Sequence, residues 1–201
     1  MASYTAIADV GNTIVQLLRD RTGDSIGDAE IALGSPGDEG AGEDFRLTVY
    51  LYDVRENEPL SNDRPRPEST GRPAGAALVL DLHYLLTAHP KKKQPNVKRT
   101  QKSLDQQEVL GRALQIVADN AIVRKPDLDE DLGEEDVLTV SISSTERRDI
   151  LDVWGTFPEV PYQPSVPLVV SPVVIDSRGD LSGPRVLEAE FSEYAYRSAG
   201  E

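Results

Sequence analysis

The sequence contains no cysteine, and this absence excludes several kinds of site at once. Disulfides, thiolate catalysis and most structural zinc sites all need cysteine. Histidine is scarce, with only His83 and His89 in 201 residues, so few imidazoles exist for acid–base or metal chemistry. Aromatic residues make up 5% of the chain. We therefore expect a core built mainly from valine, leucine and isoleucine.

Long apolar runs are also missing. No stretch of roughly 18 apolar residues occurs, and residues 1–18 lack the basic start and continuous apolar centre of a classical export signal. We expect a protein without a membrane span or signal peptide, made in the cytoplasm.

The charge balance is strongly acidic. Thirty-five acidic residues against 21 basic ones give a net charge of −14, which would repel nucleic acid and anionic membranes over most of the surface. We therefore expect no membrane partner and no specific nucleic-acid partner. Five of the six lysines lie within residues 91–102, and a surface otherwise rich in Asp, Glu and Arg fits a salt-loving host or an ordinary acidic bacterial protein.

The pattern of apolar residues predicts one α+β domain over residues 1–201. Apolar stripes at helical spacing predict two longer helices, over residues 3–20 and 104–124. Ser103 and Gln106 have the spacing of a capping box that opens the second helix, and Pro126 is expected to stop it. A short helix is expected after Ser144 or Thr145, ending at Gly155.

Alternating and continuous apolar runs predict a mixed, mainly antiparallel sheet flanked by these helices. Residues 77–87 are apolar on both faces, which favours a central strand. The run 166–176 is broken by Pro167 and Pro172 and so fits an edge strand or one with a bulge. The remaining strands are expected near 45–52, 137–143 and 185–191, and the residues expected to be buried are Leu47, Val49, Leu51, Leu80, Leu82, Leu110, Leu114 and Val140.

Polar segments rich in Gly, Pro and charge are expected to form loops and a tail. Residues 22–44 contain one short run that fits a strand. The expected loops are about 22–44, 56–75, 90–103 and 126–136, and the expected polar tail is 192–201.

Asp81 and His83 lie two residues apart on one face of the predicted central strand, as an acid–base pair or two metal ligands would. A small hydrolase using this pair is one hypothesis, and a hydrogen-bonded polar pair beside the sheet is the other. No third ligand at suitable spacing and no nucleophile motif accompanies the pair. The acidic run Asp127–Asp136 does not follow the ligand order of an EF-hand loop, so we expect no catalytic, cofactor-binding or metal-binding residue.

The stretch KKKQPNVKRTQK, residues 91–102, holds six cations and no anion in an otherwise acidic chain. It suits an acidic protein partner or nucleic acid, although no aromatic residue interleaves the cations for base stacking. The alternative is a solvated loop that pairs weakly with the chain's own acids. The candidate contact residues here are Lys91, Lys92, Lys93, Lys98 and Arg99.

Five segments, taken in order, resemble the N-terminal domain of the cap, or tail-terminator, proteins of extracellular contractile injection systems. The systems of this type are the Photorhabdus virulence cassettes and antifeeding prophages. The segments are IADVGNTIVQLL, LTVYLYDVREN, LVLDLHYLLTAH, EVLGRALQIV and STERRDILDVWGTFPEVPYQPSVPLVVSPVVIDS. The resemblance extends from about Ile7 to Asp176. The chain departs from the family in its acidic Gly-rich insert before Phe45, its long basic loop after His89 and the prolines near Val166.

The resemblance implies a tail-terminator-like fold and a structural rather than enzymatic role. Such a protein would form a ring, of six copies in related systems, that ends tube and sheath polymerisation and couples the tube to the sheath. The implied partners are further copies of the chain, the inner tube protein and the sheath protein, in a particle assembled in the cytoplasm and then released. An adaptor that binds an acidic partner through the basic loop remains an alternative. The strand residues Val169, Val170, Val173 and Val174 complete the candidate interface, because a sheet edge accepts an added strand.

Overall fold

The computed structural model describes residues 4–23, 30–38, 41, 44–57, 77–91, 97–123, 137–144 and 147–175. These residues form three helices and six strands, so the α+β fold class expected from the sequence is confirmed. In chain order they are α1 (Ala6–Thr22), β1 (Ile31–Leu33), β2 (Leu47–Glu56), β3 (Leu78–Ala88), α3 (Arg99–Asp119), β4 (Ile122–Val123), β5 (Leu138–Ile142), α4 (Arg147–Gly155) and β6 (Ser165–Ile175).

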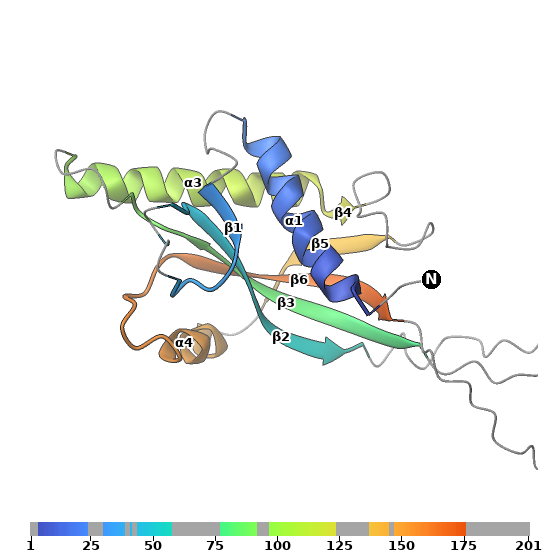
Figure 1. The fold of residues 1–201 in the computed structure, drawn as a ribbon. Helices are drawn as coiled ribbons and strands as arrows, with labels where there is room; N and C mark the ends of the chain where they lie inside the picture. The colour runs from blue at the N-terminus through green and yellow to red at the C-terminus, as the bar shows by residue number, and fades with distance from the viewer. Residues whose placement is uncertain are drawn as a thin grey trace, which may run out of the picture.

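The strands of this part of the chain form one mixed sheet in the order β1-β2-β3-β6-β5-β4. Only β1 and β2 are parallel, and every other neighbouring pair is antiparallel. The long strands β2, β3 and β6 form its centre, and the short strands β1 and β4 lie at its two edges (Figure 1). The predicted mainly antiparallel sheet with a central strand at 77–87 is therefore confirmed.

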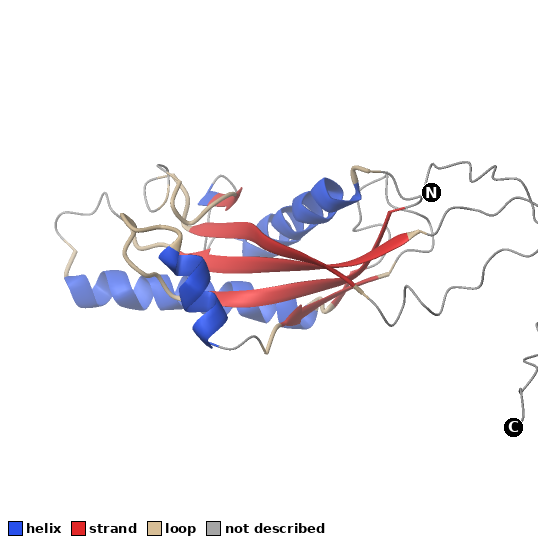
Figure 2. Cartoon of the chain, turned by 90° about the horizontal axis from the view of Figure 1, so that it is seen from below, coloured by secondary structure: helices blue, strands red, loops and turns tan. Residues whose placement is uncertain are grey.

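The helices cover the two faces of the sheet unequally. The longer helices α1 and α3 lie on one face, whereas the short helix α4 lies on the other (Figure 1). Figure 2, seen from below, shows α4 in front of the strands. The main core therefore fills the space between the sheet and the two longer helices.

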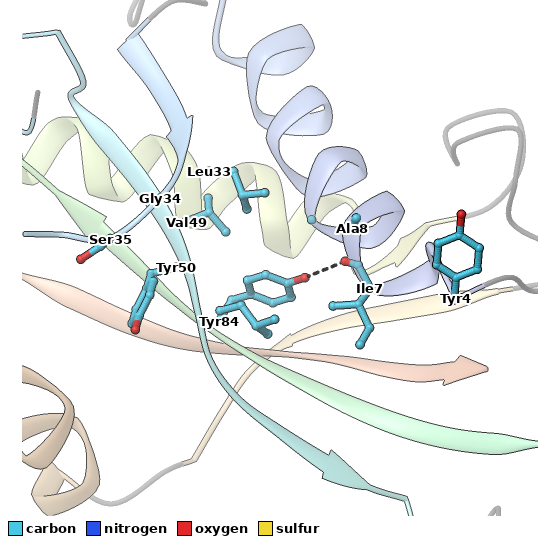
Figure 3. A pocket seen from close by; sticks show the side chains of 11 residues that line it. Tyr4, Ile7, Ala8, Leu33, Gly34, Ser35, Val49, Tyr50 and Tyr84 are labelled. Atoms are coloured by element: carbon cyan, nitrogen blue, oxygen red, sulfur yellow. Dashed lines mark hydrogen bonds between the residues drawn. The ribbon is translucent and has the colours of Figure 1, made fainter. Parts of the chain in front are cut away.

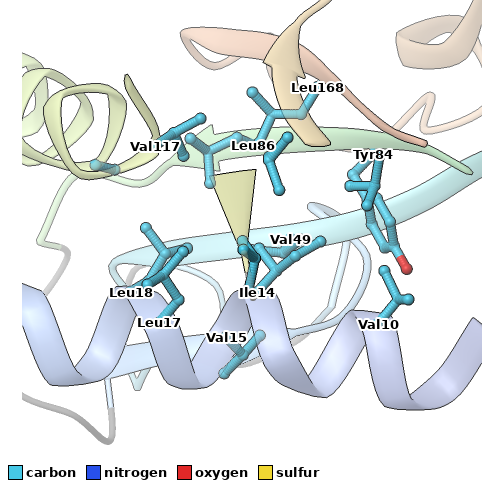
Figure 4. Close-up of a cluster of buried hydrophobic side chains, with 14 of the residues drawn as sticks. Val10, Ile14, Val15, Leu17, Leu18, Val49, Tyr84, Leu86, Val117 and Leu168 are labelled. Carbon is cyan, nitrogen blue, oxygen red and sulfur yellow. The ribbon is translucent and has the colours of Figure 1, made fainter. Parts of the chain in front are cut away.

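Helix α1 is amphipathic, as its sequence pattern predicts, and its apolar stripe faces the sheet (Figure 4). Val10, Ile14 and Leu18 are at most 2% exposed and belong to the same buried cluster as Val49 and Leu86. Burying a leucine or isoleucine side chain stabilises a fold by about 1.5–3 kcal/mol, so this stripe anchors the helix. The helix is followed by Gly23, whose φ of 56° suits a glycine because it lacks a Cβ.

Helix α3 begins and ends earlier than its sequence suggests. It begins at Arg99 rather than 104, with Lys98 at the N-cap position. The predicted capping box is wrong, because Ser103 lies inside the helix and its hydroxyl donates to the carbonyl of Arg99. Asn120, rather than Pro126, ends the helix, since its backbone and side-chain nitrogens both donate to the carbonyl of Ile116.

Strand β6 is an interior strand, so the expectation of an edge strand is wrong and the alternative of a bulge is confirmed. It pairs with β3 on one side and, over Leu168–Ser171, with β5 on the other. Leu80 of β3 pairs with Val173 and Leu82 pairs with Val170, so the register shifts between these two pairs. The extra residue of the bulge lies at Ser171 and Pro172 of β6. Pro167 and Pro172 flank the stretch that pairs with β5, which explains how a sheet interior tolerates two prolines.

Most of the predicted core residues are buried. Five of the eight are at most 6% exposed: Leu47, Val49, Leu80, Leu82 and Val140. Leu51, Leu110 and Leu114 are partly buried and pack against the same cluster. The predicted strand 185–191, most of the expected loop 56–75 and the acidic run 127–136 lie outside the described residues.

Candidate assembly surfaces

The predicted basic interface lies at one end of the sheet, where β3 ends and α3 begins (Figure 1). Lys98 and Arg99 are exposed, and Lys91 is partly exposed with its ammonium 3.7 Å from the carboxylate of Glu30. Lys92 and Lys93 lie outside the described residues. The structure therefore places three of the five predicted cations in this region, which we call the basic end: Lys91, Lys98 and Arg99, with Lys102.

The electrostatics of the basic end favour an acidic partner. The first turn of α3 holds no acidic residue, and the amino end of a helix carries a partial positive charge. Lys98, Arg99 and Lys102 add to that charge instead of compensating it. An approaching carboxylate would offset the mutual repulsion, so this end of an acidic molecule attracts negative surface.

A buried polar network beneath the basic end holds the sheet against α3. Arg46 is 3% exposed, and its guanidinium contacts both the carbonyl of His89, at 3.2 Å, and the carboxylate of Asp105, at 2.6 Å. Gln106 donates to the carbonyl of Ala88 at 2.7 Å. Sequence reasoning missed Arg46 as an anchor and treated Gln106 as a cap. Two features could have indicated these contacts. Arg46 is a charged residue directly before β2, and Gln106 is an amide on the buried side of α3.

The valines predicted as interface residues are divided between the two faces of β6. Val170 and Val173 are at most 1% exposed and belong to the core, so they cannot meet a partner without opening the sheet. Val169 and Val174 are half-buried on the opposite face. Past the start of β5, residues 172–175 of β6 have no described strand on that side, so Val174 retains a place in the predicted contact surface.

Asp81 and His83 do lie on one face of β3, but the structure does not join them in a catalytic pair. The Asp81 carboxylate accepts hydrogen bonds from Asn57, at 2.9 Å, and from the hydroxyl of Ser171. His83 is 9% exposed, and its Nδ1 has no hydrogen-bond partner among the described residues. Asp81 therefore acts as a link between β2, β3 and β6 rather than as the partner of a general base.

Charges on the adjoining strand act on His83. Asp53 on β2 lies opposite His83 in the sheet, and Arg55 lies opposite Asp81. The Arg55 guanidinium binds Asp53 at 2.7 Å, which holds the pKa of that carboxyl below its usual value. Burial lowers the pKa of His83, and the nearby Arg55 charge adds to this. Both effects favour the neutral imidazole, whereas the charges of Asp53 and Asp81 act in the opposite direction.

Aromatic rings gather between α4 and the sheet. The ring of Trp154 on α4 lies 6.1 Å from Phe157 and 5.2 Å from Tyr162, and Phe157 packs edge-on against Tyr50 of β2 at 5.8 Å. Trp154 is 6% exposed. These contacts attach α4 to the open face of the sheet.

An apolar groove of about 430 Å³ lies beside β2, where the short strand β1 ends (Figure 3). Helix α1 forms one wall of the groove, and Tyr84 lies at its base with its hydroxyl 3.5 Å from the carbonyl of Ile7. Gly11 also faces it, and a Cβ there would lie 3.2 Å from Leu33. The principal apolar lining residues are Ile7, Leu33, Val49, Leu51 and Tyr84.

The described ranges contain neither a candidate metal centre nor a candidate membrane-spanning helix. No group of three or more His, Asp or Glu side chains there is arranged to hold a metal ion. None of the helices in these ranges is both long and apolar enough to span a bilayer.

A family model described as the Pvc16 N-terminal domain matches residues 9–188. Two solved structures share the fold. The sheath/tube terminator of an extracellular contractile injection system, PVC, in its extended state, is 17% identical with a TM-score of 0.58, and the match covers 100% of this chain and 67% of that one. The tube-terminating cap of the anti-feeding prophage is 19% identical with a TM-score of 0.57, covering 92% and 61%. The chain thus spans about two thirds of the length of these proteins, and no curated protein sequence matches it.

Proposed function

Because this chain belongs to the Pvc16 N-terminal domain family, we propose that it is a structural cap that terminates the tube and sheath of a contractile injection system. The observation that carries the proposal is the family match over residues 9–188. The fold shared with a sheath/tube terminator and with a tube-terminating cap supports it. The role is structural, and the interior hydrogen bonds of Asp81 accord with that role.

A terminator must close an assembly that would otherwise continue. Tube and sheath subunits joined by head-to-tail interfaces form an open helical filament, because each added subunit offers the same surface again. A closed ring of copies bound to the last layer ends this repetition. We propose a homohexameric ring of this chain, with one face on the inner tube and the other contacts on the distal sheath subunits.

The basic end supplies the first set of contacts in this proposal. The chain carries a net charge of −14, so a neighbouring copy presents a mainly acidic surface to Lys91, Lys98 and Arg99. Charge complementarity of this kind guides association and fixes orientation more than it adds affinity. Lys92 and Lys93, which adjoin Lys91 in the sequence, belong to the same proposed interface. The half-buried Val169 and Val174, which pair with His83 and Val79 of β3, form a separate proposed contact.

The proposed cap is assembled with its particle in the cytoplasm and leaves the cell as part of that particle. It also joins the tube to the sheath end, so that sheath contraction drives the tube forward. This role requires a rigid connection rather than chemistry. The ion pair between the buried Arg46 and Asp105, together with the Gln106 bond, fixes the basic end to the sheet and suits such a connection.

Electron microscopy of particles from a strain that lacks this protein tests the proposal. We expect tubes and sheaths of uneven length, with ends that lack a terminal density, and we expect the wild-type gene to restore uniform particles. Particles of normal length with a normal terminal layer in the deletion strain would contradict the proposal.

A further inference from the structure

One edge of the sheet has a step where β1 ends. Strand β1 pairs only with residues 47–49 of β2, and Gly34 adds one further bond to the carbonyl of Val49. Among the described residues, no strand pairs with the outer side of residues 50–56. Beyond β1, this edge is therefore recessed by the width of one strand, and the space beside residues 50–56 is called the recess.

The opposite edge has a step of the complementary shape. Strand β4 pairs only with residues 138–139 of β5, and the backbone N–H of Val140 donates to the carbonyl of Ala121 just before β4. In the part of the chain that the structure describes, the outer side of residues 141–142 has no partner strand. At this edge β4 therefore projects, and the end of β5 lies one strand further in.

The two steps lie at nearly the same level of the sheet. Through the strands between them, Leu33 of β1 lies level with Leu86 of β3, and Ile142 of β5 lies level with Tyr84. From these levels, the recess and the projecting β4 both extend toward the end of the sheet where β2 and β6 end (Figure 1). Two residues of a strand span about 7 Å, so a displacement of that size aligns the β4–β5 edge of one copy with the β1–β2 edge of another.

The directions of the strands also fit. Strands β2 and β6 are both antiparallel to β3, and β5 is antiparallel to both β6 and β4. Strand β4 therefore runs in the same direction as β2, as β1 does. A β4 strand placed in the recess would continue the line of β1, and the β5 strand beside it would lie antiparallel to β1.

Exposed apolar side chains lie at the corners of both steps. Leu33, at the end of β1, is 51% exposed, and Ile142, at the end of β5, is 53% exposed. Alternate residues of a strand share a face, so Leu33 lies on the same face as the buried Ile31, and Ile142 on the same face as the buried Val140. Both are on the face that α1 and α3 cover. Aligning the steps would therefore bury Leu33 of one copy against Ile142 of the next.

The apolar groove opens at the recess. Leu33 and Gly34 line it from the end of β1, and Tyr50 and Leu51 line it from β2 (Figure 3). Val54, further along the same edge, is 42% exposed. A strand placed in the recess would thus cover an apolar surface as well as pair the backbone of β2.

A second copy of the chain is the partner that these edges fit, because each copy carries both halves of the contact. A twofold contact uses the same surface on both copies. A contact between opposite edges of one sheet is instead head-to-tail, and contacts of that kind form a ring when the rotation closes. The inference therefore rests on the ring of the proposed function and specifies which surfaces join its copies.

We propose that the β4–β5 edge of one copy adds to the β1–β2 edge of the next, with β4 in the recess and Ile142 packed against Leu33. The sheet then continues from copy to copy around the ring. Both edges are closed in this arrangement, so neither remains a template for unrelated strands.

Disulfide cross-linking in the full-length protein tests this proposal, because the wild-type chain has no cysteine to interfere. The test variant carries Leu33→Cys and Ile142→Cys. Within one chain these positions are on strands four spacings apart, about 19 Å, whereas a disulfide needs Cα atoms about 4.4–6.8 Å apart. Any disulfide must therefore join two chains. On purified tubes that lack a cap, we expect the oxidised variant to give a ladder of cross-linked species on non-reducing gels, up to the closed ring.

The single-cysteine variants distinguish a head-to-tail contact from a twofold one. Neither Leu33→Cys nor Ile142→Cys should cross-link alone, whereas a mixture of the two should give dimers and nothing larger. The matched control combines Ile142→Cys with Leu78→Cys, which is 43% exposed at the far end of β3 and should give no ladder. Dimers from either single variant, or equal cross-linking in the control, would overturn the proposal.

The same experiment separates this proposal from the proposed function. Rings that end the tubes normally but give no ladder would overturn the edge contact and leave the cap assignment intact. A chain that joins neither another copy nor a tube end would contradict both.

Hydrogen exchange provides a second, independent measurement. We expect assembly into the ring to slow exchange of the outward-facing amides within residues 50–56 at least tenfold relative to the free chain. Ile142→Asp should remove this protection, whereas Leu78→Asp, the matched control, should keep it. Equal exchange of residues 50–56 in the free chain and in the ring would refute the added strand.

Discussion

The guanidinium of Arg46 lies 2.6 Å from the carboxylate of Asp105, and this ion pair joins the start of β2 to α3 beneath the basic end. Arg46 is 3% exposed, whereas Asp105 is 38% exposed. The arginine is thus almost wholly removed from water, and its charge depends on the carboxylate and on the carbonyl of His89. Removing one partner of such a pair is costly because it leaves the other charge buried.

Asp105→Ala should therefore destabilise the protein by about 1–3 kcal/mol, the range for a buried group that loses a charged partner. The value stays below that of a fully buried pair, because water reaches Asp105 in part. Urea unfolding followed by circular dichroism measures the change. Arg55→Ala, which removes an exposed pair with Asp53, is the control and should cost less than about 1 kcal/mol. Equal losses in the two variants would show that burial of Arg46 does not matter.

Leu82→Ala should cost about 2–5 kcal/mol, since Leu82 is fully buried at the centre of β3 and its truncation leaves a cavity. The midpoint of thermal or urea unfolding gives the loss. Leu78→Ala on the same strand is the matched control. Leu78 is 43% exposed, so this variant should lose much less stability. A midpoint for Leu82→Ala equal to that of the parent protein would contradict the central position of β3.

The free energy of unfolding should fall as the pH decreases from about 7 to 5. Burial lowers the pKa of His83 below its ordinary value of 6.5, so the unfolded chain binds a proton before the folded one does. The stabilisation is complete above pH 6.5 and is lost as the pH falls below it. Asp53, whose pKa is lowered from 3.8, contributes only at more acidic pH.

The His83→Gln variant identifies the group responsible. It keeps a polar side chain but cannot take up the proton, so its unfolding free energy should change less between pH 7 and 5. The facing charges of Asp53, Arg55 and Asp81 stay in place in this variant. An identical pH dependence in wild type and variant would exclude His83 as the source.

Charge reversal at the basic end should weaken association without unfolding the chain. Lys98→Glu with Arg99→Glu changes the net charge by four, and Arg55→Glu with Arg148→Glu changes it equally at another exposed surface. We expect the first variant to weaken ring or tube association at least tenfold at low salt, and the second to have little effect. A variant that also reverses the charges of Lys91, Lys92 and Lys93 should associate more weakly still.

Salt distinguishes electrostatic contacts from other effects in this experiment. Raising the ionic strength shortens the range of charge interactions, to about 3 Å at 1 M. The difference between the wild type and the basic-end variant should therefore shrink in high salt. If both variants associate like the wild type at every salt concentration, the basic end is only a solvated surface.

Much of the fold follows from local sequence patterns, and the exceptions have physical causes. The apolar stripe in α1 predicts burial well because each side chain's environment repeats with the period of the helix. In β2 the alternation predicts the burial of Leu47 and Val49 but not that of Thr48, which is 1% exposed. The start of α3 was misjudged because Ser103 favours a cap by composition, whereas the helix extends back to Arg99. Pro167 and Pro172 suggested an edge, since a sequence does not reveal where a neighbouring strand such as β5 ends.

The polar contacts were the part of the structure that the sequence predicted least. Arg46 and Asp105 are 59 residues apart, and Asp81 meets Ser171 across 90 residues. No local pattern encodes such pairs, because they form only when the sheet brings their strands together. The basic end was evident from composition alone, whereas its rigid attachment through Gln106 was not.

Addition of the purified protein to purified tubes that lack a cap tests the proposed function most directly. Tube subunits are supplied for further growth, and tube length and the density at tube ends are measured by electron microscopy. The account predicts that the wild-type protein binds the ends as a closed ring of six copies and stops elongation at substoichiometric amounts. A protein that remains monomeric, leaves the ends bare and allows tubes to elongate as before would contradict it.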